Sequence, residues 1–546
     1  MNNQVPPLAD YDISAADPAL RSALTSAGCT LSPAGTELAK DAGSAEIIEA
    51  ARLADGHPPV LRTHDRAGTR IDEVEYHPAW HTLMDRAVRA GLQAAPWAPD
   101  AAPDAHLQRA AGFYLWTQTE SGHLCPISMT YSAVPALRHS PLLTAQFEAG
   151  LRSRTYDFGL RPAAVKHGLL AGMSMTDKQG GSDLRQIITT AAPVRPSPAD
   201  GAEYRLTGHK WFTSAPMNDV FLTLALAPGG LSCLLVPRVL PDGSRNGITL
   251  LRLKDKLGNR SNASAEIEYN DAIGWRVGDE GRGLATMLEM VTMTRLDCVL
   301  GSAGQMRAAM SQAAFYASRR LAFGHLLIGQ SAMTAVLADL AIESWAATAT
   351  AIRLADLVQT HQSGGESTAA TLLRLALPVA KFWVCKRAVP VIAEALECLG
   401  GNGYVETFPL ARLLRESPLN GIWEGSGTVT ALDALRAVQR SPASGEALLA
   451  ELGAATGIIA SFDRGVRELA DLLHHPLEPV AARAFSSLAG RLFAAALLIR
   501  QAPHVVADLY CQTRLAAPGD RVFGELPAAS DADLRRLVVS ITPEIS

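Results

Sequence analysis

The spacing of apolar residues divides this chain into segments of different texture. From about residue 78 to 170, apolar residues recur at helical spacing and are interrupted by proline-containing loops. Between 171 and 280, short apolar pieces such as Val220–Leu226 alternate with turn signals such as Asn246-Gly247, which predicts a compact β domain. From 283 onward, long segments rich in Ala, Leu and Arg predict amphipathic helices of bundle length. These helices are expected at 283–322, 331–361, 368–399 and 426–440.

The two ends of the chain differ from the middle. Residues 1 to about 60 are rich in Pro, Ala, Asp and Gly, with a short helical pattern near 44–54, and predict an irregular arm. Residues 441–546 again have a helical pattern after a Ser-Pro-Ala-Ser-Gly break. The expected fold is mainly α with a central β domain. The predicted domains are an N-terminal arm and helical domain (1–170), a central β domain (171–280), a four-helix bundle (281–440) and an extra C-terminal helical domain (441–546).

Composition narrows the class of protein. Of 546 residues, 48% are hydrophobic and 19% charged, and the formal charge of −5 argues against a surface that is basic throughout. The seven cysteines form no CxxC pair, and His77 and His81 lack a third ligand, so we expect neither a disulfide framework nor a metal site. The first residues have no signal-peptide pattern, and no uninterrupted apolar run approaches the ~20 residues of a membrane span. We therefore expect a cytoplasmic protein that does not bind a membrane.

Two motifs in the β region carry candidate chemistry. Met173–Asp183 places hydroxyls beside a Gly-Gly turn whose N–H groups can face an anionic or carbonyl-rich ligand, although such a loop also closes ordinary hairpins. Gly208–Ser214 sets an aromatic pair before two hydroxyls, where a planar ring can stack. A tryptophan that serves only the β core is the alternative interpretation.

Three motifs lie in the helical half. An arginine at a helix end beside Phe323-Gly324 can clamp a pyrophosphate, or simply face solvent. Glu397–Tyr404 holds three glycines within four positions, more than a helix stop requires, but its spacing is not that of a Rossmann fingerprint. In Ile422–Thr428, a carboxylate follows an aromatic residue in a glycine-loosened loop, which suits a general base. Glu424 is that carboxylate.

Together these motifs resemble the acyl-CoA dehydrogenase family from about residue 80 to 440. Met173–Asp183, Asp255–Trp275 and Ile422–Gly427 resemble more closely its AidB-type branch, flavoproteins linked to the bacterial response to DNA alkylation. The resemblance implies a fold of an N-terminal helical domain, a β-barrel or sandwich and a C-terminal four-helix bundle, with an extra C-terminal helical domain. It also implies FAD as cofactor, acyl-CoA as substrate and a homotetramer.

The resemblance assigns roles residue by residue. Glu424 becomes the catalytic base, and Arg295 and Trp423 line the substrate pocket. The implied cofactor contacts of the β domain are Met175, Thr176, Gln179, Gly180, Gly181, Ser182, Trp211, Phe212 and Thr213. Those of the helical half are Arg320, Phe323, Gln330, Gly400, Gly401, Trp423, Gly425, Ser426 and Thr428.

The implied function is that of an FAD-dependent, acyl-CoA dehydrogenase-like oxidoreductase with weak activity on short or branched acyl-CoA. The AidB-type resemblance adds protection of DNA from alkylation by binding the duplex, with Arg436, Arg440, Arg464 and Arg467 as candidate contacts. Residues 441–546 hold nine arginines, no lysine and twelve acidic residues, so this segment is not basic overall. Two alternatives stay open: an efficient metabolic acyl-CoA dehydrogenase with no DNA role, and a flavin-dependent oxygenase on the same fold.

Overall fold

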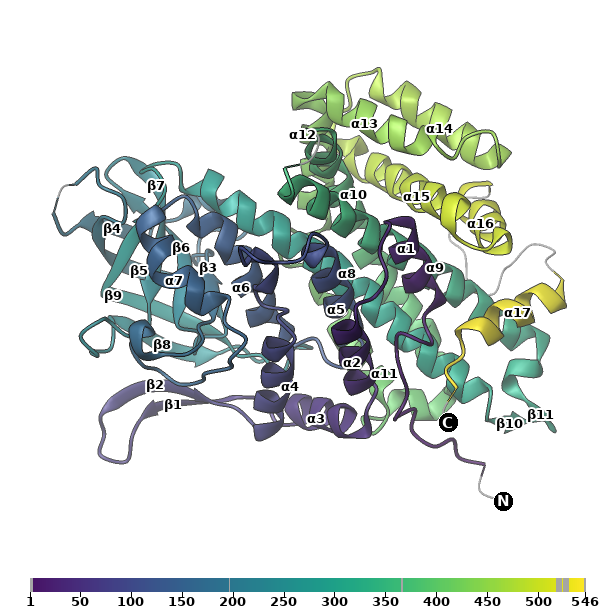
Figure 1. Cartoon of the computed structure of the whole chain (residues 1–546), viewed down its shortest axis with the longest axis horizontal. Coiled ribbons are helices and arrows are strands. Elements are labelled where there is room, and N and C mark those ends of the chain that lie inside the picture. The colour runs from purple at the N-terminus through teal and green to yellow at the C-terminus, as the bar shows by residue number, and fades with distance from the viewer. Residues whose placement is uncertain (1–2, 196, 365–366, 517–522, 524–529, 545–546) are drawn as a thin grey trace. The chain divides into compact units, whose positions relative to one another are not determined.

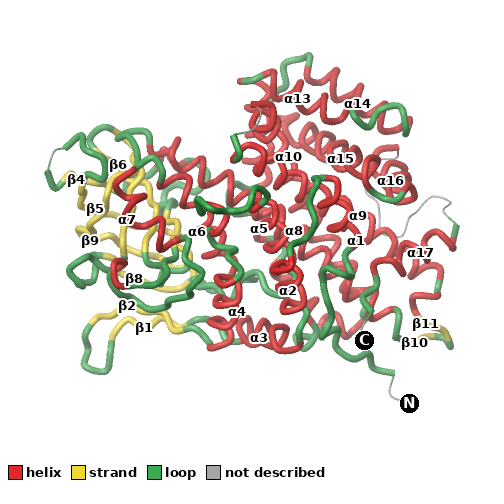
Figure 2. The backbone as a smooth tube through the Cα atoms, viewed as in Figure 1, coloured by secondary structure: helices red, strands yellow, loops and turns green. Residues whose placement is uncertain are grey.

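The computed structural model describes residues 3–195, 197–364, 367–516, 523 and 530–544. Two compact units are present, each built from separated stretches of chain (Figure 1). Unit 1 comprises Met1–Ile48, Pro103–Thr119 and Arg295–Ser546, and unit 2 comprises Glu49–Ala102 and Glu120–Thr294. Most strands fall in unit 2, while the described part of unit 1 is helical apart from one hairpin with two residues in each strand (Figure 2).

Unit 2 is organised by a seven-stranded sheet. Its strand order is β3-β6-β4-β5-β9-β7, β8 pairs with β9, and an additional β6–β7 pairing closes the path into a barrel. The strands of this sheet are β3 (Ala171–Ser174), β4 (Thr190–Pro193), β5 (Glu203–Ser214), β6 (Val220–Ala227), β7 (Gly230–Pro237), β8 (Ile248–Leu253) and β9 (Ser264–Val277). The other elements are α3 (Ala45–Gly56), β1 (Val60–His64), β2 (Arg70–Glu75), α4 (Pro78–Arg89), α6 (Leu124–Leu137) and α7 (Pro141–Leu151).

Unit 1 is a helical bundle around three long helices. Most of α8 (Gly283–Ala317) belongs to it, with α9 (Ser331–Gln362) and α10 (Ser367–Glu397). Shorter helices complete it: α1 (Pro18–Ser26), α2 (Pro33–Ala42), α5 (Ala105–Thr117), α11 (Pro409–Glu416), α12 (Gly427–Arg440), α13 (Pro442–Gly453), α14 (Ala460–Leu473), α15 (Ala482–Gln501), α16 (His504–Cys511) and α17 (Asp531–Ile541). The hairpin is β10 (Leu321–Ala322) with β11 (His325–Leu326). The predicted fold class, mainly α around a central β region, is confirmed.

Two features of the fold differ from the sequence predictions. The N-terminal arm is not irregular throughout, because Asp17 and Ser32 cap α1 and α2 and a proline opens each helix. The β1–β2 hairpin was not predicted. Among the described residues, three helices, including Ser331–Gln362, are long and apolar enough to cross a membrane by length and composition, although none is an uninterrupted apolar run. Between 72% and 89% of their most apolar windows is buried inside the protein, so packing in the bundle accounts for this composition.

A buried charge network ties the C-terminal helices to the bundle. Arg514, in the π-helical turn η8 (Gln512–Ala516), donates to Glu343 at 2.9 Å and pairs with Asp339 at 2.5 Å. Arg387 donates to the same glutamate at 3.1 Å. Burial alone would raise the pKa of Glu343, but the charges of Arg387 and Arg514 lower it to about 2. The extra helical segment is therefore fixed by ion pairs that water does not screen.

We expect R514A to destabilise unit 1 strongly, since it leaves two carboxylates buried with less positive charge. The loss should be about 3–5 kcal/mol, the range for breaking a buried pair. R500A is the control, because Arg500 is 35% exposed and pairs with Glu451 at 3.1 Å, and it should cost under about 1 kcal/mol. Urea unfolding at pH 7 measures both, and equal losses would contradict this account.

The wild-type protein should also lose this contribution in acid. The folded pKa of Glu343 lies below its ordinary value, so its stabilisation is complete above the ordinary value and declines as pH falls toward about 2. R514A should show a shallower acid decline.

Candidate functional site

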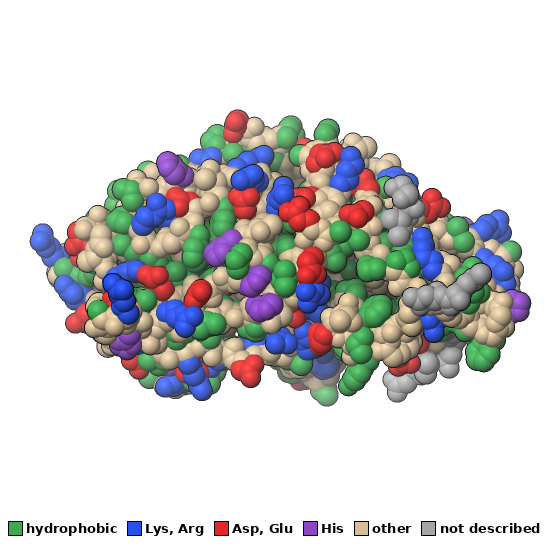
Figure 3. Space-filling view, turned by 90° about the horizontal axis from the view of Figure 1, so that it is seen from below, with side chains coloured by type: hydrophobic (Ala, Val, Ile, Leu, Met, Phe, Trp, Pro, Cys, Tyr) green, Lys and Arg blue, Asp and Glu red, His purple; other side chains and the backbone are tan. Residues whose placement is uncertain are grey.

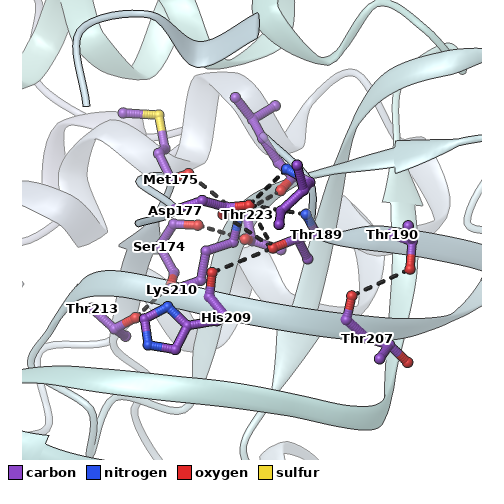
Figure 4. A network of polar contacts seen from close by, with 12 residues as sticks. Ser174, Met175, Asp177, Thr189, Thr190, Thr207, His209, Lys210, Thr213 and Thr223 are labelled. Carbon is purple, nitrogen blue, oxygen red and sulfur yellow. Dashed lines mark hydrogen bonds and ion pairs between the residues drawn. The ribbon is translucent and has the colours of Figure 1, made fainter. Parts of the chain in front are cut away.

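The first group of predicted site residues lies in unit 2, around a buried ion pair. Lys210 of β5 and Asp177 of the turn after β3 approach to 2.7 Å, with side chains 0% and 1% exposed (Figure 4). Asp177 also accepts from the backbone N–H groups of Ile188 and Thr189, both at 2.9 Å. Burial opposes ionisation of the pair, lowering the pKa of Lys210 to about 8. The Lys210 charge nevertheless keeps the pKa of Asp177 below its ordinary value.

This ion pair brings two predicted motifs together. The Lys210 ammonium donates to the carbonyl of Met175 at 3.3 Å, and the backbone N–H of Trp211 donates to the carbonyl of Thr176 at 2.7 Å. The Gly-Gly turn and the aromatic pair are thus fixed side by side. Neither Asp177 nor Lys210 was predicted, because the two residues are 33 positions apart in the sequence.

A bulge in β5 decides which side chains leave the sheet. Lys210 pairs with Ile267 and Thr213 with Ala265, so three steps on β5 match two on β9. Lys210 and Thr213 therefore both point inward, and the extra residue places Trp211 and Phe212 on the outer side. Phe212 is 47% exposed.

The resemblance implied that Thr213 lies near the flavin, and this role stays a prediction. Its hydroxyl is bonded to that of Ser174 at 2.5 Å, and the residue is 1% exposed (Figure 4). The side chain is therefore part of the sheet and not an exposed donor. Ser214, the second hydroxyl of this motif, is half-buried.

The turn itself presents donors outward. Gln179, Gly181 and Ser182 are exposed, and Thr176 is half-buried. A Cβ on Gly180 would come within 2.5 Å of the Asp183 carbonyl, so the tight turn requires glycine there. Amide and hydroxyl donors beside an exposed aromatic ring fit a ligand with a planar ring and a diphosphate, as FAD has.

The second group lies in unit 1, in the loop before α12. Glu424 has a φ of 56°, a left-handed backbone conformation that side-chain-bearing residues seldom adopt. Its backbone carbonyl accepts a hydrogen bond from Arg295 Nε at 3.0 Å. The Trp423 indole N–H donates to Asn420 Oδ1 at 2.9 Å, which fixes the ring. Strained backbone of this kind is a frequent mark of functional loops.

Arg295 is positioned by a charge network. It pairs with Asp433 at 2.6 Å, and Arg374 donates to the other oxygen of that carboxylate at 2.9 Å. Burial would raise the pKa of Asp433, but the hydrogen bond from Arg374 and the charge of Arg295 hold it low. Arg295 thus contacts the Glu424 loop directly, and its implied role in a substrate pocket stays a prediction.

The remaining predicted cofactor residues of unit 1 are joined by the N-terminal arm. Asn3 donates to the carbonyl of Leu321 at 2.8 Å and accepts from the Arg320 side chain through its own carbonyl. Asn402 donates to Gln4 at 3.0 Å and to the Tyr316 hydroxyl at 3.2 Å. The arm therefore holds the β10–β11 hairpin beside the Gly400–Gly401 turn, a contact that the sequence did not reveal.

The exposure of this segment suits a binding role. Phe323 is 94% exposed with a φ of 53°, and Gly400 and Gly401 have open space where a Cβ would stand. Gln330 donates to the Ala322 carbonyl at 3.1 Å. The loop residues Gly425 and Ser426 are half-buried, and Thr428 is exposed at the start of α12.

The four arginines proposed for nucleic acid lie on two helices. Arg436 and Arg440 belong to α12, and Arg464 and Arg467 to α14. All four are exposed. Figure 3 shows one face of the molecule, on which basic and acidic side chains are interspersed.

The chain matches three known domain families in the expected order. Residues 3–158 match the N-terminal domain of the adaptive response protein AidB. Residues 172–272 match the acyl-CoA dehydrogenase middle domain, and 281–439 match the acyl-CoA dehydrogenase C-terminal domain. Together these matches cover most of both units.

Individual relatives agree with this assignment. AidB of Escherichia coli (strain K12) is 43% identical over 525 residues, covering 95% of this chain and 94% of its own. Acyl-CoA dehydrogenase family member 11 of Caenorhabditis elegans is 32% identical, covering 72% of this chain and 64% of its own. The structure of Caenorhabditis elegans ACDH-11 in complex with C11-CoA has a TM-score of 0.84 at 27% identity, covering 94% of this chain and 93% of that one.

The ion pair under the Gly-Gly turn leads to a prediction about cofactor affinity. K210M should weaken FAD binding at least tenfold, or ~1.4 kcal/mol, because Asp177 loses its charge partner and the Met175–Ser182 turn loosens. Recovery of flavin fluorescence on dilution of the holoprotein measures the release. K178M is the control, since Lys178 is exposed on the same turn. Unchanged affinity in K210M would show that the turn does not depend on this pair.

Proposed function

The chain belongs to the acyl-CoA dehydrogenase family of FAD-dependent oxidoreductases, in its AidB branch, and we propose that it dehydrogenates short or branched acyl-CoA thioesters at a low rate. One observation carries the proposal. Glu424 is a carboxylate held in a strained left-handed turn, with its carbonyl anchored by Arg295 at 3.0 Å. Strain maintained by charged side chains fits a residue whose direction matters for chemistry.

Glu424 would act as a general base. Its carboxylate would remove the proton from the carbon next to the thioester carbonyl, and the negative charge that develops on that oxygen would need hydrogen-bond donors. Because Arg295 binds the Glu424 carbonyl, the backbone of the turn keeps one orientation throughout the reaction. FAD, when bound, supplies the hydride acceptor.

The residues beside the base support low turnover and small substrates. Trp423 is bulkier than the tyrosine usual before the family's glutamate, and its indole is fixed by Asn420 at 2.9 Å. A fixed indole next to the base restricts the acyl group that can reach it. The nematode relative is named as a complex with C11-CoA, which supports a thioester ligand in this branch. An efficient metabolic dehydrogenase and a flavin-dependent oxygenase are the competing functions.

Self-association forms part of the proposal. Leu321, Phe323 and Leu326 of the β10–β11 hairpin are 49%, 94% and 41% exposed, and Tyr404 and Val405 are 81% and 46% exposed. Apolar side chains exposed to this degree favour burial against another surface. A homotetramer, as the family resemblance implies, would provide it.

Protection of DNA from alkylation is the second proposed function, supported by the 43% identity to AidB. The four exposed arginines of α12 and α14 are its candidate phosphate contacts. The C-terminal segment is acidic overall, so duplex affinity would have to come from such local clusters.

E424Q should abolish flavin reduction while leaving the flavin bound. Glutamine keeps the size of the side chain but cannot accept the α-proton, so we expect the rate to fall by about 10³-fold or more. Anaerobic bleaching of the flavin absorbance, with a panel of straight and branched acyl-CoAs of four to eight carbons, measures it.

The same panel of acyl-CoAs distinguishes the proposed slow dehydrogenase from an efficient metabolic dehydrogenase and from an oxygenase. Slow bleaching that E424Q removes supports the proposal, whereas bleaching at hundreds per second would indicate a metabolic dehydrogenase. Flavin that no acyl-CoA reduces would overturn dehydrogenation. Oxygen consumption by chemically reduced flavin would then test the oxygenase.

Duplex binding should depend on salt and on the arginine pairs. If Arg436 and Arg440 each neutralise a phosphate, R436Q/R440Q should lower the slope of log K against log salt by about 1.8, at ~0.9 per contact. R464Q/R467Q tests the α14 pair in the same way. R62Q/R66Q on the exposed β1–β2 hairpin is the matched control, and identical slopes in all variants would exclude these helices as the contact.

A further inference from the structure

Lys381 is a cation that the predicted chemistry leaves unused. It lies in the middle of α10 and is 2% exposed. Its ammonium donates to the carbonyl of Asn420 at 3.0 Å and to the carbonyl of Gly425 at 2.8 Å. Removing an ammonium group from water is costly, so a lysine at such a site is retained only where surrounding oxygens compensate it.

The two acceptors stand on either side of Glu424. Asn420 is the middle residue of the short turn η6 (Leu419–Gly421), and Gly425 directly follows the glutamate with a φ of 98°. The carbonyl between them, that of Glu424 itself, accepts from Arg295. Three carbonyls of one loop are therefore held by cationic side chains from α8 and α10. Holding these carbonyls fixes the peptide planes around the left-handed residue.

The same neighbourhood is coupled electrostatically. Burial raises the pKa of the Cys298 thiol, which feels the positive charge of Lys381 together with the charge of Glu424. Lys381 also acts on the buried thiol of Cys385, whose Sγ accepts from the Ser302 hydroxyl at 3.3 Å. Lys381 and Glu424 therefore lie close enough to act on one thiol.

Other charged groups pack around the loop. From α8 come Arg295 and Asp297, and Asp297 forms a buried ion pair with Arg109 of α5. From α12 comes Asp433, paired with Arg295 and with Arg374 of α10. Asp297 and Asp433 thus already have guanidinium partners. Among the described residues, the two hydrogen-bond acceptors of Lys381 are both neutral carbonyls.

We propose that Lys381 is the positioning residue of this active site: it acts on Glu424 through the carbonyls of Asn420 and Gly425 and sets the direction and charge state of the base. The effect of Lys381 on catalysis rests on the proposed dehydrogenase function, whereas its effect on the conformation of the Glu424 loop does not. Its positive charge favours the ionised carboxylate, so removing it should raise the apparent pKa of the base.

The first experiment does not depend on turnover. Hydrogen exchange of the peptide covering residues 419–430 is measured in the FAD-loaded protein for wild type, K381M and K381R. We expect exchange at least tenfold faster in K381M and within threefold of wild type in K381R, which keeps a cation. K166M is the matched control, because the side chain of Lys166 is 2% exposed, binds the Gly159 carbonyl at 3.1 Å and pairs with Asp219 in unit 2.

The second experiment follows proton removal apart from hydride transfer. A 3-oxoacyl-CoA (acetoacetyl-CoA) has an acidic α-proton but cannot be dehydrogenated to the usual product, and its enolate is detected through the absorbance change of the bound flavin. In K381M the pH at half-maximal enolate formation should rise by one unit or more, while K381R should restore it. Flavin reduction by butyryl-CoA should fall at least 30-fold in K381M, with its half-saturating concentration changed less than threefold.

The outcomes separate this inference from the proposed function. If wild type neither reduces its flavin nor forms the enolate, dehydrogenation fails, and faster loop exchange confined to K381M still supports the positioning role. If loop exchange and the enolate pH profile are unchanged in K381M, the inference is wrong. It is also wrong if K166M changes the 419–430 peptide as much as K381M does. If K381M does not fold, K381R decides the test. Hydrogen exchange of its 419–430 peptide as fast as in a free peptide would overturn the inference, whereas exchange within threefold of the wild-type rate supports it.

Discussion

A buried ammonium group must be surrounded by oxygen atoms, and both functional loops of this chain are arranged around one. Lys210 donates to the carbonyls of Met175 and Leu224 and to the carboxylate of Asp177. Lys381 donates to the carbonyls of Asn420 and Gly425. The C=O and N–H groups of a peptide plane point in opposite directions. A carbonyl that faces a buried cation therefore directs the N–H group of the same peptide plane away from it. The desolvation cost of each lysine is thereby linked to one particular loop conformation. The loop with the Gly-Gly turn and the loop with the left-handed Glu424 each contain a carbonyl that binds such a lysine.

Much of the fold could be predicted because the local periodicity of apolar residues indicates where the long helices lie. The expected helix at 331–361 is observed as Ser331–Gln362, and the one at 426–440 as Gly427–Arg440. The short α1 and α2 were missed although their signals were present, an aspartate or serine cap followed by proline. In both helices the capping signal was present, but the segment has few apolar residues, so the helical periodicity was weak.

The parts of the site that escaped prediction depend on contacts between distant residues. A single bulge in β5 turns the Thr213 hydroxyl inward to Ser174, and a bulge cannot be predicted from the alternation of apolar and polar residues alone. Asp433 lies 138 positions from Arg295 in the sequence, so neither segment by itself predicts that the two residues pair. Glu424 could be proposed from the sequence because its signal is local: a carboxylate with an aromatic neighbour before it and a glycine after it.

The N-terminal arm has a consequence for how the protein is made. Asn3 meets Leu321 after 318 intervening steps of chain, and Gln4 meets Asn402 after 398. At synthesis rates of about 5–20 residues per second, the first residues wait roughly 20–80 seconds for their partners to leave the ribosome. Unit 2 closes within residue 294, whereas unit 1 needs the first and the last parts of the chain. The barrel can thus fold during translation, while the helical unit, which holds Glu424 and the β10–β11 hairpin, is completed only after its last helices have been synthesised.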